Sequence, residues 1–436
     1  MPLKTSSELA FFGGGPAGIG PIMCAAQENR LEQLLCRSVS IFERAPSLCA
    51  GAFAGYAIRS DTRADVLLEC LSSAGARHFA ALAEDPTTAA VAARGEGPLP
   101  LRELGAFLEA LGRTVQGWCQ GAPAVAFRPR HHLLRIELGT SRHTAVFESE
   151  SGCVEHTFER GVLALGGYQD EAAMLREPIA GDASLASLGL AERTMPSDRL
   201  LREGGIADLA VRLDRRAGSG AEPRIVILGG SHSAFTAAHL LRTQLGHRFG
   251  ASGIRIYSRR PPRLFFPSAE AALNAGYTDF TSDDICPTTQ RLFRLAGLRF
   301  DGRETLLHML GLGVPVDRRC VWQPLSSSSP SELIDALRDC DVVIAALGYR
   351  PRRVPILRDG AALRLTADHG GPLVNERCGV LGASGTEIPG LLALGLASGF
   401  VPQGSLGGEP SFRGQTNGLW LYQNGVGRIV LDRLLA

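Results

Sequence analysis

Short apolar runs that end in glycine recur along the chain. The first, residues 8–12, precedes the glycines at 13–15, and apolar residues at helical spacing follow in residues 21–37. This pattern predicts a buried strand, a turn free of side chains, and a helix that begins near Pro16, where a missing N–H costs nothing. A second apolar strand, residues 39–43, comes next. Together these segments predict a β-α-β unit at the start of the chain.

The same pattern restarts near residue 224. A buried strand at 225–228 is followed by a small-residue turn, an amphipathic helix and the strand of "IRIYSRRPPR". Two further apolar runs, 161–169 and 341–352, end in small residues and glycine, and we expect the chain to cross between two nucleotide domains there. The prediction is therefore an α/β protein with two Rossmann-like domains, the second inserted in the first. Its expected parts are residues 1–200, 201–350 and 351–436.

Other patterns predict elements around these units. "LRELGAFLEALGRTVQGWCQ" at 101–120 has apolar residues at helical spacing, and residues 131–167 read as a three-stranded meander. The stretch "SSSSPSEL" predicts a helix capped by Ser329 or Ser331. The meander carries four histidines that we expect at the surface rather than as ligands: His131, His132, His143 and His156.

The first turn has the spacing that binds a dinucleotide. Gly13, Gly15 and Gly18 form G-x-G-x-x-G, which places a pyrophosphate at a helix N-terminus, with Pro16 and Ala17 inside the same turn. Glu43 ends the next strand, where a carboxylate accepts hydrogen bonds from adenosine ribose, and Arg44 follows it. The alternative is a glycine-rich turn with Glu43 merely solvated.

The second turn differs in its polar residues. Gly229, Ser231 and Ala234 occupy the three glycine positions, with Ser233 beside them. The following strand ends in Ser258, Arg259 and Arg260, with Arg263 nearby, instead of an acid. Guanidinium groups bind a 2′-phosphate that a carboxylate would repel, so this end favours NADPH over NADH. The alternative is a solvated basic loop.

Composition limits the other classes of function. A net charge of +1 gives no electrostatic reason to expect nucleic acid or an anionic membrane as partner. No run reaches the roughly 20 apolar residues of a membrane span, and the N-terminus does not resemble a signal peptide, so we expect a cytoplasmic protein. The ten cysteines include no C-x-x-C and no zinc-ligand spacing, which predicts reduced thiols and no metal site. The sequence leaves open whether the protein forms a homo-oligomer.

The two turns together resemble those of the flavoprotein superfamily with two dinucleotide-binding domains, over nearly the full chain. The match lies at Gly13, Gly15, Gly18 and Glu43, and again at the second turn and the paired arginines. The resemblance implies FAD in the first site and NADPH in the second.

Within that superfamily, the chain is most similar to flavin-dependent N-hydroxylases of ornithine, lysine and other amines. "ALGYRPRRVP" resembles their ATGY string, and "LFFPSAEAALNAGYTDFTSDDICPTTQRLF" resembles their long loop after the NADPH arginines. The cysteine pairs of disulfide reductases are absent, and Cys49, six positions past Glu43, is more readily a buried residue than a redox thiol. The resemblance implies an FAD-containing, NADPH-dependent monooxygenase. It would transfer oxygen from O₂ through a C4a-hydroperoxyflavin to an amine nitrogen or another soft nucleophile.

Two regions depart from the family or extend it. Arg59, Ser60 and Asp61 stand where siderophore enzymes carry "SFLKDL", so we expect them to contact a different substrate. Gly395 lies where a late strand reaches the cofactor, but Leu396 replaces the aspartate common in reductases. A C-terminal helix that starts at Thr416 or Asn417 would point its positive end at the flavin, with Gln415 and Asn417 beside the cofactor. The alternative is a helix that only packs.

Two other functions fit the same motifs. An NADPH-dependent reductase would pass electrons to a quinone or a protein acceptor, and a non-enzymatic flavoprotein would use the nucleotide sites for stability or redox sensing. Since the flavin would do the chemistry, we assign no side chain as acid or base.

Overall fold

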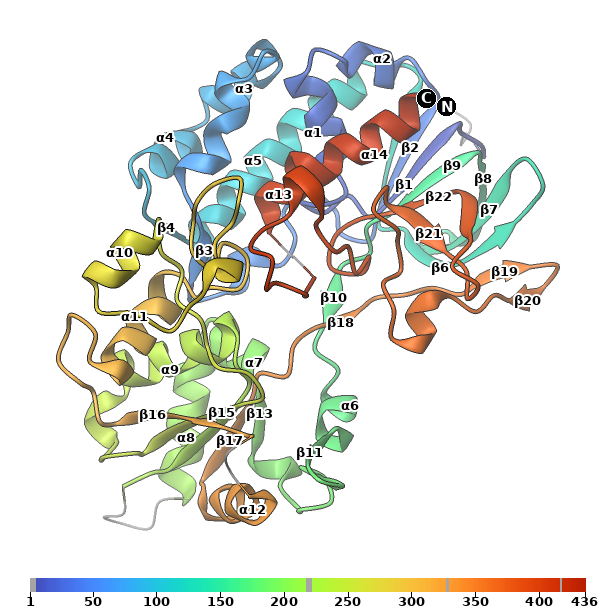
Figure 1. Ribbon diagram of the computed structural model, residues 1–436. Helices are drawn as coiled ribbons and strands as arrows, with labels where there is room; N and C mark the ends of the chain where they lie inside the picture. The colour runs from blue at the N-terminus through green and yellow to red at the C-terminus, as the bar shows by residue number, and fades with distance from the viewer. Residues whose placement is uncertain (1–4, 217–221, 327–328, 416–417) are drawn as a thin grey trace.

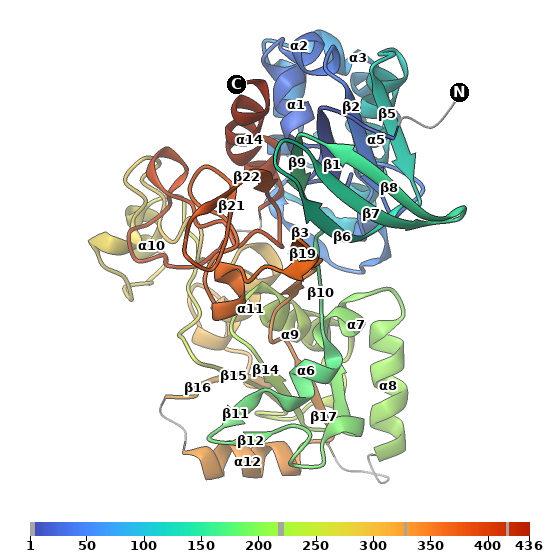
Figure 2. The same cartoon turned by 90° about the vertical axis from the view of Figure 1, so that its right-hand side faces the viewer.

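The structure is a computed structural model that describes residues 5–216, 222–326, 329–415 and 418–436. Two lobes lie one above the other in Figure 1. The upper lobe contains both ends of the chain, and the lower lobe contains its middle part. The side view in Figure 2 shows the same division.

A six-stranded sheet forms the centre of the upper lobe. In order across the sheet, its strands are β21 (Gly379–Leu381), β22 (Glu387–Ala393), β9 (Arg160–Leu163), β1 (Leu9–Phe12), β2 (Val39–Glu43) and β5 (Val125–Pro129). All neighbours are parallel except β21 and β22. Every residue of β1 and β2 is buried, as the apolar runs predict for strands covered on both faces.

Helices cover one face of this sheet. The long helix α5 (Leu101–Gln120) has the predicted bounds, and α1 (Gly20–Gln27) packs against α14 (Gly425–Leu435) from the far end of the chain (Figure 1). The smaller helices of this lobe are α2 (Leu31–Leu35), α3 (Ala80–Ala83), α4 (Pro86–Ala92) and α13 (Leu419–Gln423). The predicted C-terminal start at Thr416 or Asn417 lies outside the described residues.

The first helix begins later than predicted. Residues 16–19 form a turn, and α1 starts at Gly20 rather than near Pro16. Pro21 explains the difference, because it has no N–H to donate to the Ala17 carbonyl. That carbonyl instead accepts the Gly20 N–H at 2.9 Å, which closes a tighter turn.

A second sheet packs on the opposite face. The predicted meander is β6 (His132–Leu138), β7 (His143–Ser149) and β8 (Gly152–Phe158), and β19 (Ile356–Arg358) and β20 (Ala361–Ala362) extend it. The ring of Phe42 on β2 stacks on Phe147 of β7 with centroids 4.1 Å apart. The prediction that the meander histidines lie at the surface is wrong for His143 and His156, which are buried. Each finds a polar partner there: His143 contacts the Pro389 carbonyl, and His156 contacts the Ser7 hydroxyl.

The lower lobe contains a fully parallel five-stranded sheet. Across it lie β13 (Thr194–Pro196), β17 (Val342–Ala345), β14 (Ile225–Leu228), β15 (Ile254–Ser258) and β16 (Cys320–Pro324). The helices of this lobe are α6 (Glu171–Arg176), α7 (Ser197–Leu201), α8 (Gly205–Arg216), α9 (His232–Gln244), α10 (Ala269–Asn274), α11 (Phe300–Leu310) and α12 (Pro330–Asp339). Ser329 caps α12 by accepting the Glu332 N–H, in agreement with one of the two predicted caps.

Three short antiparallel pairs of strands complete the fold. β3 (Arg59–Arg63) pairs with β4 (Pro98–Pro100), and β11 (Pro178–Ala180) pairs with β12 (Ala183–Ser184). The chain crosses between lobes at β10 (Gly167–Tyr168), which pairs with β18 (Arg350–Pro351) on the return. We therefore propose domain boundaries at β10 and β18. The expected boundary after residue 200 falls too late, because β13 already belongs to the lower sheet.

Candidate active site: two nucleotide cradles and the junction between them

The first cradle is the glycine turn after β1. Gly13 has φ +104°, and a Cβ on Gly18 would lie 1.9 Å from the Gly13 carbonyl oxygen, so both positions require glycine. A Cβ on Gly15, in contrast, would meet nothing within 4 Å. Backbone atoms thus fill the space beside Gly18, whereas the space beside Gly15 is free, so the backbone can approach a pyrophosphate there. These residues fit the dinucleotide that the sequence predicts.

Glu43 completes this cradle at the end of β2. Its buried carboxylate accepts the Gly14 N–H at 2.7 Å and the Ala45 N–H at 2.8 Å. A carboxylate has about four lone-pair positions, so it can still accept ribose hydroxyls. The alternative of a merely solvated Glu43 is wrong.

Other predicted cofactor residues surround the turn. Gly395, with φ +85°, follows β22, and a Cβ there would lie 3.0 Å from Ala17 Cβ. The Pro16 carbonyl accepts a hydrogen bond from Gln423 of α13 at 3.3 Å. Arg44 is exposed. Gly395 thus lies beside the turn that contains Pro16 and Ala17. Contact of these residues and Arg44 with the cofactor stays a prediction.

The predicted flavin-edge residues are less defined. Gln415 is exposed, close to Gly399, and Asn417 lies outside the described residues. Cys49 is fully buried, and burial raises the pKa of its thiol, which disfavours the reactive thiolate.

The second cradle follows β14. Gly229 has φ +141°, and a Cβ there would lie 2.3 Å from the Ala346 carbonyl oxygen. Ser231 is exposed at the N-cap of α9. Within that helix, Ser233 is half-buried and Ala234 is buried. Small residues thus stand at all three positions of this turn, and the exposed N-terminal end of α9 suits a phosphate.

The arginines predicted for a 2′-phosphate lie at the surface beside this cradle. Arg259 is 72% exposed and Arg260 is exposed. Ser258 does not join them, because its buried hydroxyl donates to the Arg260 carbonyl at 2.7 Å and accepts the Trp322 indole N–H at 2.8 Å. Arg263 is also occupied, by Asp279 at 2.8 Å. Two of the four polar residues at this strand end thus face outward.

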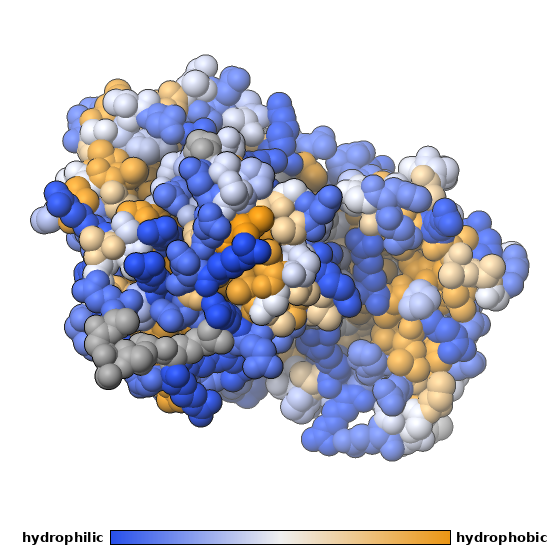
Figure 3. All heavy atoms as spheres, turned by 90° about the horizontal axis from the view of Figure 1, so that it is seen from below, coloured by the Kyte–Doolittle hydropathy of each residue, from blue (hydrophilic) through white to orange (hydrophobic). Residues whose placement is uncertain are grey.

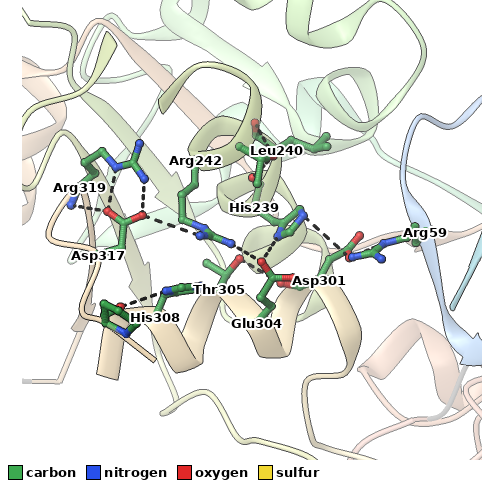
Figure 4. Close-up of polar contacts among 12 residues, drawn as sticks. Arg59, His239, Leu240, Arg242, Asp301, Glu304, Thr305, His308, Asp317 and Arg319 are labelled. Atoms are coloured by element: carbon green, nitrogen blue, oxygen red, sulfur yellow. Dashed lines mark hydrogen bonds and ion pairs between the residues drawn. The ribbon is translucent and has the colours of Figure 1, made fainter. Parts of the chain in front are cut away.

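The predicted substrate residues lie on β3, at the junction of the lobes. Arg59 donates from Nε to Asp301 Oδ1 at 2.7 Å, and Asp301 belongs to α11 of the lower lobe (Figure 4). Figure 4 also shows His239 beside the same carboxylate, with Nε2 4.0 Å from Oδ1. Ser60 is buried, and its hydroxyl accepts the Thr62 N–H. Arg59 and Ser60 therefore have structural partners, and Asp61 alone of the three is exposed without a hydrogen bond among the described residues.

Asp61 faces charged groups of the lower lobe. Burial lowers the pKa of His232 and outweighs the opposing effect of Asp61. His232 Nε2 accepts the Arg299 backbone N–H at 3.2 Å, which places the proton of the neutral ring on Nδ1. The Arg299 guanidinium stacks over the Phe265 ring at 4.1 Å. The junction thus combines one exposed carboxylate, a neutral histidine and a half-buried guanidinium.

A second contact between lobes escapes sequence reasoning. Asp198 on α7 accepts hydrogen bonds from Tyr56, from Tyr349 at 2.7 Å and from Arg202 at 2.9 Å. These bonds hold the pKa of Asp198 below its ordinary value although burial works against it. The same environment raises the pKa of Tyr349, first through burial. Only Tyr349, inside the ATGY-like string, carried any sequence signal.

Comparison with known proteins identifies the family. No family model matches the chain. A curated protein, the CMP-5′-(3-aminopropyl)phosphonate hydroxylase of Streptomyces rubellomurinus, is 33% identical over 432 residues, which cover 97% of this chain and 96% of the relative. The chain belongs to the family of this hydroxylase. Membership of a hydroxylase family confirms the predicted enzyme class, an oxidoreductase.

Solved structures of N-hydroxylases share the fold of this hydroxylase family member. The FAD-bound cadaverine monooxygenase DfoA of Erwinia amylovora superposes with a TM-score of 0.58 at 12% identity, covering 99% of this chain and 95% of that one. The ornithine N-hydroxylase of Kutzneria sp. 744, with reduced FAD, NADP⁺ and L-ornithine, gives 0.52 at 13% identity, covering 98% and 99%. The predicted fold class, with two Rossmann-like domains, is confirmed. No helix among the described residues is long and apolar enough to cross a membrane.

Proposed function

We propose that the protein is an FAD-containing, NADPH-dependent monooxygenase that hydroxylates the amine nitrogen of a phosphonate linked to a nucleotide. One observation carries the proposal: the 33% identity with CMP-5′-(3-aminopropyl)phosphonate hydroxylase extends over 97% of the chain. The fold shared with amine N-hydroxylases supports nitrogen as the acceptor atom. When bound, FAD supplies the activation of O₂ after reduction by NADPH.

The residues of both cradles fit these cofactors. The open face at Gly15 and the buried carboxylate of Glu43 suit the pyrophosphate and ribose of FAD. The exposed guanidinium groups of Arg259 and Arg260 suit the 2′-phosphate of NADPH. The chain's own part in the reaction is to bind and orient the cofactors and the substrate, and to exclude water at the junction.

Charges at the junction suit an anionic substrate. Burial lowers the pKa of Arg299, and the charges of Arg291 and Arg294 lower it further. Arg299 Nη2 also donates to the Arg294 carbonyl at 2.8 Å, so these two arginines lie close together. Guanidinium groups are the usual partners of phosphate and phosphonate oxygens. Ornithine, lysine and cadaverine have no such group, so the cluster supports a phosphonate or phosphodiester substrate.

Substrate-dependent oxidation of NADPH tests the proposal. The FAD-loaded enzyme is mixed with NADPH, O₂ and either CMP-5′-(3-aminopropyl)phosphonate, ornithine, lysine or cadaverine. We expect the phosphonate alone to accelerate NADPH consumption and to gain one oxygen atom as a hydroxylamine, detected by mass spectrometry. Equal stimulation by ornithine or lysine would exclude the phosphonate specificity. NADPH consumption without any hydroxylated product would favour a reductase.

A further inference from the structure

Two arginines from distant segments meet one carboxylate beside the second cradle. Arg259 follows β15, Arg350 begins β18, and Glu177 directly follows α6. Arg259 Nη2 lies 3.4 Å from Glu177 Oε1, and Arg350 Nη2 lies 3.4 Å from Oε2. Each oxygen of the carboxylate thus faces one guanidinium group, which is also how two guanidinium groups share the oxygens of a phosphate.

The position of this group fits a nucleotide. Glu177, Leu347, Gly348 and Arg350 line a cavity of about 250 Å³ at the end of β17. Parallel sheets bind nucleotides outside the carboxyl ends of their strands, and β17 neighbours β14, which leads into the glycine turn. Figure 3 shows that the surface is hollowed where the two lobes meet.

The two ion pairs are easily exchanged. The side chains of Arg259 and Arg350 are 72% and 50% exposed, and Glu177 is 29% exposed. Ion pairs between exposed side chains contribute little to stability because water screens their charges. A ligand with more charge than one carboxylate therefore replaces Glu177 at little cost to the fold.

We propose that Arg350 binds the 2′-phosphate of NADPH together with Arg259, and that Glu177 occupies this phosphate position until the cofactor displaces it. This inference rests on the proposed function. A phosphate monoester carries about −1.5 to −2 charge at neutral pH, against −1 for the carboxylate, so both arginines prefer it. Glu177 holds the two guanidinium groups in place beforehand and opposes the phosphate by like-charge repulsion. It therefore sets the affinity for the phosphorylated cofactor.

Calorimetric titration of the FAD-loaded protein with 2′,5′-ADP and with 5′-ADP tests the assignment without turnover. Loss of one charge-assisted hydrogen bond weakens binding by about tenfold or more. Arg350→Ala should therefore lower the affinity for 2′,5′-ADP by that factor and leave the affinity for 5′-ADP unchanged. Glu177→Gln should tighten 2′,5′-ADP roughly two- to fivefold, because it removes the competing charge. Arg353→Ala is the matched control, since Arg353 lies on the same segment and pairs with Asp368 instead.

The outcomes separate this inference from the proposed function. If the wild-type protein does not prefer 2′,5′-ADP over 5′-ADP, the second cradle is not an NADPH site, and both ideas fail. If the wild type shows the preference but Arg350→Ala keeps it, or weakens both ligands equally, only the role of Arg350 is overturned. If Glu177→Gln weakens 2′,5′-ADP, the displaced-carboxylate part is wrong. Flavin content and thermal unfolding check that each variant is folded.

Discussion

The two nucleotide cradles have the same strand-turn-helix plan but differ in what holds them. In the first, Gly13 and Gly18 pack against backbone, and the buried Glu43 ties the turn to β2. In the second, serine and alanine replace two glycines, and the selective groups are exposed arginines. Backbone packing shapes both turns, since a Cβ on Gly229 would also lie 2.3 Å from the Ala346 carbonyl oxygen, but the selective groups of the second cradle lie at the surface. Substitutions at the packed glycines should consequently act through the fold, and those at the exposed arginines through affinity alone.

The largest expected effect is at Gly18. Gly18→Ala would place a methyl group 1.9 Å from the Gly13 carbonyl oxygen, so the turn must move. Overpacking of this kind costs about 1–3 kcal/mol or more, and here it also deforms the cradle. We expect the purified variant to contain no FAD and to unfold at a lower temperature than the wild type, by absorbance and calorimetry.

Gly15→Leu separates packing from binding in the same turn. Because a Cβ at this position meets nothing within 4 Å, the apoprotein should keep its thermal stability. The longer side chain fills the space that the pyrophosphate needs, so FAD should still be lost. Normal flavin content in this variant would show that the cofactor does not approach at Gly15.

The next effect concerns the second cradle. Replacing both Arg259 and Arg260 by alanine removes charge-assisted hydrogen bonds worth about 1.5–3 kcal/mol each. The KM for NADPH should rise at least tenfold, while the KM for NADH and the melting temperature stay near their wild-type values. Since surface charge is screened by salt, the same preference should shrink as NaCl is raised from 50 to 500 mM. Parallel losses with NADPH and NADH would contradict a 2′-phosphate role.

The contrast also explains what could be predicted from the sequence. The glycine spacing, the apolar strands and Glu43 lie within short segments, so their geometry follows from local rules. The pairs Arg59–Asp301, Tyr56–Asp198 and Arg350–Glu177 join residues more than 100 positions apart, and no local pattern marks them. The pairing of Arg59 across the junction is therefore invisible in the sequence, and its contact with a substrate stays a prediction. The burial of His143 and His156 has the same cause, because their partners Pro389 and Ser7 lie far away in the sequence.

A smaller effect is expected at the junction, which both cradles share. Arg59→Ala leaves the carboxylate of Asp301, only 8% exposed, without its guanidinium partner. Leaving a buried charged group short of a partner costs about 1–3 kcal/mol, reduced here because Arg59 itself is 43% exposed. The urea midpoint should fall. Arg135→Ala, which breaks the exposed pair with Glu137, should leave it unchanged. Equal midpoints for both variants would mean that Arg59 does not tie the lobes together.

The smallest effect is the part of the pH dependence of stability that comes from His232 in the second cradle. Burial lowers the pKa of His232, so the unfolded chain binds a proton more readily than the folded one. The free energy of unfolding should therefore fall as the pH drops below about 6.5, by at most about 1.4 kcal/mol per pH unit for this group. His232→Gln keeps an acceptor for the Arg299 N–H but does not titrate, so its loss of stability between pH 7 and pH 5 should be shallower. Burial also lowers the pKa values of His143 and His239, so part of the dependence should remain.

The control is a variant of the first cradle. Its glycine turn, residues 13–18, contains no histidine, so Gly15→Leu should retain the full wild-type slope of stability against pH. Urea unfolding at the two pH values measures this difference, and identical slopes for His232→Gln and the wild type would remove His232 as its source.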